Sequence, residues 1–290
     1  MLKYLLYFYH SITMLSKGNI LFKNMDSVRL KVYDSALTKN YDERTALVFL
    51  HGSPGQISNW KYQIKYFEQY YRVIAYDQRG YGESTKPKKV SLNDYLDDLT
   101  RILENRNLEI EDVILVGHSF GGMVAQAYAA KNKVKGLVLV GSLVKLRPDI
   151  IDWIVWYLPS IFWKRLFFTE NFLTRKLYRQ IFFSDYAPDE IYEEFIRDNA
   201  DYISSLPGHA FRYLKYFRDY DATAFLSEIK SPTLIIVGGH DKVGTPDQSK
   251  NIHEKIPGSE LVIVEKAGHF VLYEKAEEIN NLIHIFIKSL

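Results

Sequence analysis

Cysteine is missing from the chain, and its absence excludes a disulfide framework, a zinc site built on thiolates and a cysteine nucleophile. The chain also has little excess charge of either sign, because 37 Lys and Arg stand against 35 Asp and Glu, a formal net charge of +2. No basic run has the density typical of a phosphate-binding surface, so we expect no nucleic-acid partner. A protein without cysteine fits a reducing compartment, and we expect it to be cytoplasmic.

Motifs for metals and nucleotides are missing as well. No His-x-x-x-His pair or Asp-rich loop has the spacing of metal ligands, and neither a P-loop nor G-x-G-x-x-G follows a strand-like run. We therefore expect no metal and no cofactor, and a small-molecule substrate as the partner. The sequence carries no signal for an oligomeric state.

A hydrophobic run long enough to cross a bilayer is also absent. The most apolar stretch, MLKYLLYFYH at residues 1–10, is too short, and no small-residue cleavage site of a signal peptide follows it. We interpret residues 1–18 as an apolar N-terminal extension that packs on the body, or that precedes a later start at Met14 or Met25. Contact of this segment with a membrane surface is the alternative, but it lacks the basic face of such helices.

What the chain does contain is an alternation of strand-like and helix-length segments, which predicts an α/β fold with helices on both faces of a mostly parallel sheet. With 290 residues, 47% of them hydrophobic, the chain suits one large domain that carries an insertion. Eight strands are predicted, at residues 19–23, 28–34, 45–50, 71–77, 112–117, 134–140, 232–238 and 260–265. Helices are predicted at residues 60–68, 92–106, 120–131, 246–256 and 276–288.

One of these junctions has the sequence of a nucleophile elbow. The buried run VILV (113–116) leads through GHSFGG (117–122) into an Ala-rich helix, so that Ser119 sits on a sharp strand-to-helix turn. Small residues are needed two positions before and after Ser119, because the turn brings neighbouring backbone close. The N-terminal amides of the helix would face negative charge that develops near this serine.

A base and an acid follow in the order that a serine nucleophile needs. Asp241 comes after the strand TLIIV (233–237), and His269 comes after LVIV (261–264) behind a glycine. Open α/β sheets bind ligands at this edge, and Ser119, Asp241 and His269 are therefore the candidate catalytic residues. Asp247 competes for the role of the acid, but its place in the first turn of a helix suggests a helix-terminal charge.

Five motifs together resemble the α/β-hydrolase superfamily: HGSPG (51–55), DQRGYGES (77–84), GHSFGG (117–122), GGHD (238–241) and AGH (267–269). The resemblance runs from about Asn19 to the C-terminus. It implies the α/β-hydrolase fold with a mostly parallel eight-stranded sheet and a helical cap inserted after the sixth strand. Serine at position 119 differs from the aspartate that haloalkane dehalogenases and epoxide hydrolases carry there.

The cap is expected at residues 145–219, where strand-like runs stop and aromatic residues accumulate, and the core at 19–144 and 220–290. Most of these aromatics should form the core of the cap, and a few should line an apolar cleft over the site. Trp156, Trp163 and Phe183 are the candidates for substrate binding.

Backbone N–H groups of Ser53 and Phe120 should form the oxyanion hole. His51 is expected to be a structural hydrogen-bonding residue. Asp77 and Arg79 are expected to form a scaffold turn, with Arg79 as an anchor for a substrate carboxylate in the alternative.

The leading hypothesis is a serine hydrolase, similar to carboxylesterases, that cleaves a small or medium apolar carboxylic ester through an acyl-enzyme. A proline-iminopeptidase-like aminopeptidase is an alternative, because HGSPG and DQRG resemble that family and acidic cap residues could hold an amine; these are Asp185, Asp189, Glu190, Glu193 and Glu194. A hydrolase of carbon–carbon bonds and a ligand receptor without turnover remain open as further alternatives.

Overall fold

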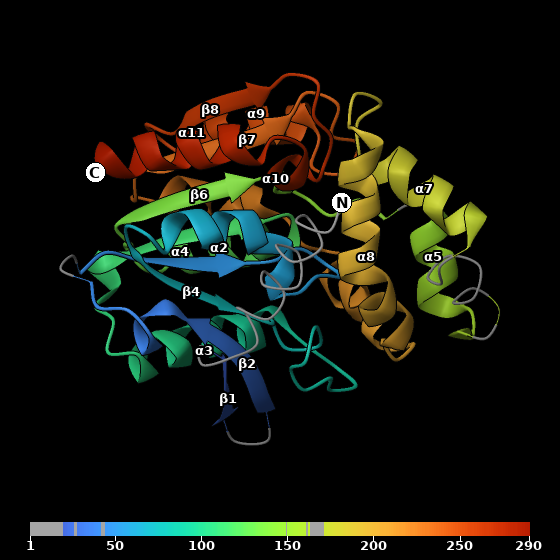
Figure 1. Cartoon of the computed structure of the whole chain (residues 1–290), viewed down its shortest axis with the longest axis horizontal. Coiled ribbons are helices and arrows are strands. Elements are labelled where there is room, and N and C mark those ends of the chain that lie inside the picture. Colours follow the sequence, from blue (N-terminus) through green and yellow to red (C-terminus); the bar gives the residue numbers. More distant parts are fainter. Residues whose placement is uncertain (1–19, 26–27, 42–43, 149, 161, 163–170) are drawn as a thin grey trace, which may run out of the picture.

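The strands form a single sheet in which all but one run in the same direction. The structure is a computed structural model that describes residues 20–25, 28–41, 44–148, 150–160, 162 and 171–290, so the predicted N-terminal extension lies outside the described residues. The described residues build an eight-stranded sheet in the order β1-β2-β4-β3-β5-β6-β7-β8, with antiparallel pairing only for β1 with β2 and β2 with β4 (Figure 1). The strands are β1 (Ile20–Met25), β2 (Val28–Asp34), β3 (Ala46–Leu50), β4 (Arg72–Tyr76), β5 (Val113–His118), β6 (Gly136–Val140), β7 (Thr233–Gly238) and β8 (Glu260–Val264).

The central strands are buried on both faces. Every residue of β3, β5, β6 and β7 is buried, which is why these segments are almost continuously hydrophobic in the sequence. Alternate side chains point to opposite faces: Leu47 and Phe49 belong to one core cluster, and Val48 and Leu50 to the other.

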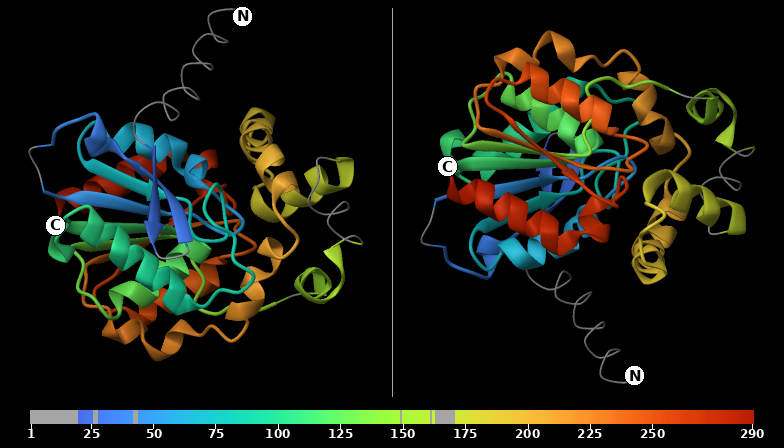
Figure 2. Two further views of the ribbon diagram at one scale, coloured as in Figure 1. Left: turned by 90° about the horizontal axis from the view of Figure 1, so that it is seen from below. Right: turned by 90° about the horizontal axis from the view of Figure 1, so that it is seen from above.

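Helices cover each face of the sheet, as Figure 2 shows from two sides. One layer contains α3 (Leu92–Asn105), α4 (Phe120–Ala129) and α9 (Pro246–Lys255), and the other contains α2 (Lys61–Phe67), α10 (Val271–Glu274) and α11 (Ala276–Lys288). The predicted helix at 60–68 begins with a 3₁₀ turn, η2 (Ile57–Trp60), and the one at 120–131 ends at Ala129. The α/β fold class with a mostly parallel sheet is confirmed.

The described part of the segment between β6 and β7 is helical, as expected for an insertion after the sixth strand. It contains α5 (Ile150–Tyr157), α7 (Phe172–Phe182) and α8 (Asp189–Ser205), followed by the 3₁₀ segment η4 (Ala210–Phe217). Figure 1 shows this cap beyond the carboxyl ends of the parallel strands, with α8 nearest the sheet. Its two connections to the core pair with each other: Ala222 N–H donates to Val144 O at 2.8 Å, and Leu146 N–H donates to Tyr220 O at 3.3 Å.

Helix α8 is joined to the core by side chains. Asn59 Nδ2 donates to Asn199 Oδ1 at 3.0 Å, and the Tyr202 hydroxyl donates to Gly55 O at 2.8 Å. Lys61 of α2 pairs with Glu194 and Asp198 of α8. This side of the cap is therefore fixed against the loop that follows β3.

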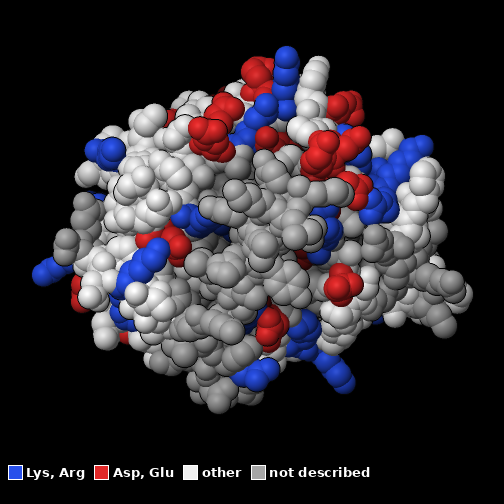
Figure 3. Space-filling model, in the orientation of Figure 1, with Lys and Arg blue, Asp and Glu red and all other residues white. Residues whose placement is uncertain are grey.

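Charged side chains of both signs are interspersed on the face of the molecule in Figure 3. Within the described ranges, no helix has the length and apolar character needed to cross a bilayer.

Candidate active site

Ser119 occupies the turn between β5 and α4. Its backbone is in the left-handed region, with φ 51° and ψ −116°, which is rare for a residue with a side chain. Its N–H donates to Val140 O at 3.0 Å, at the end of the neighbouring strand β6. Gly121 is required here because an added Cβ would lie 2.2 Å from Leu50 O. The turn thus has the close backbone approach that the elbow sequence predicts.

Asp241 and His269 form a buried hydrogen-bonded pair. His269 Nδ1 lies 2.8 Å from Asp241 Oδ2, and the two residues are 3% and 4% exposed. The other carboxylate oxygen accepts hydrogen bonds from Val243 N–H at 2.7 Å and Gly244 N–H at 2.9 Å. Because an ionised carboxylate can only accept, His269 Nδ1 must carry the proton, and Nε2 of the neutral ring is left free to accept one.

Two residues next to Ser119 in space bring the serine and this pair together. The ring of His118 lies 4.7 Å from the His269 ring, centre to centre, and its Nε2 lies 3.0 Å from His269 O. Gly141 has φ +51°, and an added Cβ would lie 2.9 Å from Asp241 Oδ2 and 3.2 Å from His269 Nδ1. The three candidate catalytic residues therefore converge at one edge of the sheet. Burial lowers the pKa of His118 well below its usual range, so this neighbour stays neutral.

The loop after β3 lies beside Ser119, as an oxyanion loop must. An added Cβ at Gly52 would lie 3.2 Å from Ser119 Cβ, which places Ser53 next to the serine. The Ser53 hydroxyl lies 2.7 Å from the Tyr81 hydroxyl, which fixes its side chain. Phe120 is the first residue of α4, so its N–H has no acceptor within the helix.

His51 is held inside this loop by both ring nitrogens. Its Nε2 accepts from Gln78 N–H at 2.9 Å, and its Nδ1 donates to Gly52 O at 2.7 Å. Burial lowers the pKa of His51 to about 4. A neutral ring with two backbone partners supports the structural role expected for it.

The aromatic candidates for substrate binding occupy different places. Trp156 and Phe183 are 2% and 1% exposed, and Phe183 packs on Phe270 at 5.5 Å between ring centres, whereas Trp163 lies outside the described residues. Burial of this degree favours a packing role for Trp156 and Phe183. The preceding residue, Phe182, is only partly buried and lies 5.9 Å from the His269 ring. The local sequence does not distinguish Phe182 from Phe183, because the position at which α7 ends decides which of the two rings faces His269.

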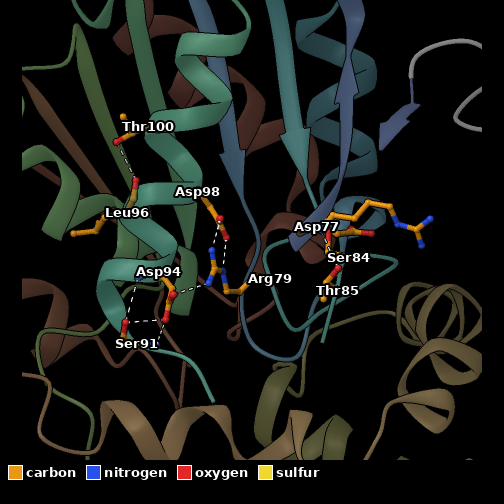
Figure 4. A network of polar contacts seen from close by, with 10 residues as sticks. Asp77, Arg79, Ser84, Thr85, Ser91, Asp94, Leu96, Asp98 and Thr100 are labelled. Carbon is orange, nitrogen blue, oxygen red and sulfur yellow. Dashed lines mark hydrogen bonds and ion pairs between the residues drawn. The ribbon is translucent and has the colours of Figure 1, made fainter. Parts of the chain in front are cut away.

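Arg79 lies in a network of ion pairs with two carboxylates. Its guanidinium donates twice to Asp98, at 2.6 and 2.7 Å, and once to Asp94 at 2.5 Å (Figure 4). Asp77 accepts from Ile57 N–H and Glu83 N–H at 2.7 and 2.8 Å, and burial raises its pKa to about 6. These contacts support the scaffold role of both residues over substrate binding.

The alternative acid, Asp247, is not at the site. It lies in the first turn of α9, its side chain is 93% exposed, and it pairs with Lys250 at 3.6 Å. In the described part of the chain, no group of three or more His, Asp or Glu residues lies together in a way that could hold a metal ion.

Comparison with known proteins identifies the family. The family model described as "alpha/beta hydrolase fold" matches residues 45–276. Proline iminopeptidase from Thermoplasma volcanium is 27% identical over 277 residues (87% of this chain, 91% of that protein), and AB hydrolase superfamily protein YisY from Bacillus subtilis is 30% identical over 263 residues (84% and 91%). The crystal structure of bromoperoxidase from Bacillus anthracis superimposes with a TM-score of 0.77 at 23% identity, covering 94% of this chain and all of that one.

Other similar proteins differ in the reactions that their names state. Epoxide hydrolases and 2-hydroxy-6-oxo-2,4-heptadienoate hydrolase are among the relatives in sequence, and esterases are among the similar structures. The fold is common to all of them, and the chemistry depends on the site. The chain belongs to the alpha/beta hydrolase family, and hydrolysis is the activity that this membership supports.

Proposed function

We propose that the protein is a serine hydrolase that cleaves small or medium apolar carboxylic esters through an acyl-enzyme. The observation that carries this proposal is the buried Asp241–His269 pair beside Ser119, which stands at the N-terminus of α4. A hydroxyl is a poor nucleophile until a base takes its proton, and this arrangement offers a base in the required tautomer.

The reaction would proceed in two halves. The Ser119 hydroxyl attacks the ester carbonyl while His269 Nε2 takes its proton, and Asp241 stabilises the imidazolium that forms. Backbone N–H groups of Ser53 and Phe120 donate to the oxygen of the tetrahedral intermediate. When the intermediate collapses, His269 protonates the departing alcohol. Water then attacks the acyl-enzyme with the same proton transfers, which releases the acid and restores Ser119.

Epoxide opening fits this nucleophile poorly, although several relatives are named epoxide hydrolase. Attack of a serine hydroxyl on an epoxide carbon would form an ether, which water does not cleave under the same catalysis. A carboxylate nucleophile would form an ester, which water can hydrolyse. Ser119 therefore favours acyl transfer.

The aminopeptidase is the second candidate, because relatives at 27–29% identity are named proline iminopeptidase. Its substrate amine would need a carboxylate from the cap. Three of the five candidate carboxylates already pair with cations of the protein: Glu194 with Lys61, Glu193 with Arg175 and Asp189 with Arg179. The other two, Asp185 and Glu190, are exposed. Because these carboxylates already have cationic partners within the protein, they are poorly placed to bind a substrate amine, and this favours the ester as the substrate. Carbon–carbon bond cleavage would use the same three residues and remains a further alternative.

A substrate panel tests the proposal. We expect turnover of p-nitrophenyl esters, with kcat/KM rising up to about fourfold per added methylene until the pocket is full, since each buried CH₂ is worth about 0.8 kcal/mol. Prolyl and alanyl p-nitroanilides should be poor substrates, and N-acetylation of an amino-acid ester should not abolish turnover. A strict requirement for the free amine would overturn the ester proposal in favour of the peptidase, and no turnover of any activated ester would favour a receptor.

A further inference from the structure

The loop that carries His269 is held by the backbone groups of three successive residues. Gly268 N–H donates to Glu274 Oε1 at 2.9 Å, and His269 O lies 3.0 Å from His118 Nε2. Phe270 N–H donates to Phe182 O of the cap at 3.0 Å. The orientation of the His269 ring thus depends on partners from outside its own loop.

Glu274 connects this loop with the cap. Besides Gly268 N–H, its carboxylate accepts the Ser184 N–H at 3.2 Å and the Ser184 hydroxyl at 2.5 Å. Ser184 belongs to the turn between α7 and α8 and is 2% exposed. The turn and the loop are in close contact, because an added Cβ at Gly268 would lie 2.6 Å from Ser184 N. One carboxylate therefore spans a junction between two segments that are far apart in the sequence.

We infer that Glu274 is a positioning residue for His269, and that it couples the docking of the α7–α8 turn to the orientation of the imidazole. This inference rests on the proposed function, in which His269 is the base. Glu274 itself contacts neither Ser119 nor the Asp241–His269 pair in the hydrogen bonds described above. It acts through Gly268 on one side and through Ser184 on the other.

The hydrogen bonds predict which substitutions of Glu274 preserve the geometry of the junction. In Glu274→Gln the amide oxygen can accept both N–H groups, and the amide nitrogen can donate to the Ser184 hydroxyl, whose proton then turns to Lys266 O at 3.2 Å. Glu274→Asp keeps the charge but draws the carboxylate back by about one C–C bond, 1.5 Å, so that it cannot span both segments. The neutral glutamine should therefore preserve the geometry better than the charged aspartate does.

Steady-state kinetics on the best p-nitrophenyl ester test this order. We expect Glu274→Ala and Glu274→Asp to lower kcat on the order of 10- to 100-fold, the effect of a misplacement of about 1 Å, with KM changed less than twofold. Glu274→Gln should stay within about threefold of the wild type. Glu277→Ala is the matched control and should leave kcat unchanged, because Glu277 is an exposed carboxylate in the first turn of the next helix, α11.

A proton NMR signal gives a readout that does not depend on turnover. The downfield resonance of His269 Nδ1–H, assigned by its loss in Asp241→Asn, should persist in Glu274→Gln and broaden or disappear in Glu274→Ala and Glu274→Asp. Should Glu274→Ala fail to fold, Ser184→Ala, which removes one hydroxyl, should still lower kcat by a smaller factor.

Full kcat and an intact resonance in Glu274→Asp would overturn the positioning role. Equal losses in the glutamine and alanine variants would also overturn it, because they would mean that charge rather than hydrogen bonding matters. Absence of ester turnover in the wild type would instead count against the proposed function, while the resonance would still report on Glu274.

Discussion

Replacement of Asp241 by asparagine should nearly abolish turnover while leaving the fold intact. One carboxylate oxygen accepts the N–H groups of Val243 and Gly244 at 2.7 and 2.9 Å, so the amide oxygen of asparagine must take this place. The amide nitrogen then faces His269 Nδ1 and donates to it. His269 is forced to carry its proton on Nε2, where it cannot accept the proton of Ser119. The same substitution in a Ser-His-Asp triad costs about 10⁴ in kcat, which is about 5.5 kcal/mol of transition-state stabilisation.

The assay is kcat and KM on a p-nitrophenyl ester for the wild type, Asp241→Asn and the control Asp247→Asn. We expect a loss of about 10⁴ in kcat with little change in KM for the first variant, and wild-type kinetics for the control, whose exposed side chain lies on α9. Retention of more than a tenth of the wild-type kcat in Asp241→Asn would refute the tautomer argument. A loss in Asp247→Asn instead would move the role of the acid to that residue.

Two further predictions concern the polar network beneath the site. Burial raises the pKa of Asp77 to about 6, so its protonation stabilises the fold below about pH 4 and this contribution is lost as the pH rises through 6. The free energy of unfolding, measured with urea, should fall by about 3 kcal/mol between pH 4 and 7 in the wild type, and this fall should be absent in Asp77→Asn. The same dependence of the unfolding free energy on pH in both proteins would contradict this prediction. Arg79→Met should cost about 3–5 kcal/mol of stability, because it leaves the buried carboxylate of Asp98 without its partner. Unchanged stability together with a raised KM for an acidic ester would instead make Arg79 a substrate anchor.

Much of the sheet could be predicted because buried strands have a distinctive sequence. β7 is a run of β-branched and aliphatic residues bounded by proline and glycine, and the predicted range of 232–238 differs from the structure by one residue. The positions of Ser119 and Asp241 could be predicted in the same way, since each follows such a strand and the carboxyl ends of parallel strands meet at one edge. His269 follows the apolar edge strand β8, of which only Val264 is buried.

The side of the site that faces the cap could not be predicted from periodicity. Phe182 and Phe183 are adjacent aromatic residues, and their different surroundings depend on where α7 ends. Glu274 has the sequence context of an exposed helix-terminal charge, whereas in the structure it is partly buried and accepts hydrogen bonds from Ser184 of the α7–α8 turn. The surroundings of Phe182 and of Glu274 depend on contacts between segments that are distant in the chain, and the local sequence does not predict these contacts.

Covalent labelling of the wild-type protein tests the central claim most directly. A fluorophosphonate should phosphonylate the activated serine once per chain, with loss of fluoride, and peptide mapping by mass spectrometry should place the adduct on Ser119. Labelling should disappear in Ser119→Ala and slow strongly in Asp241→Asn, while thermal unfolding shows that both variants are folded. An adduct on Ser53 or Ser142, or full ester turnover by Ser119→Ala, would contradict the account.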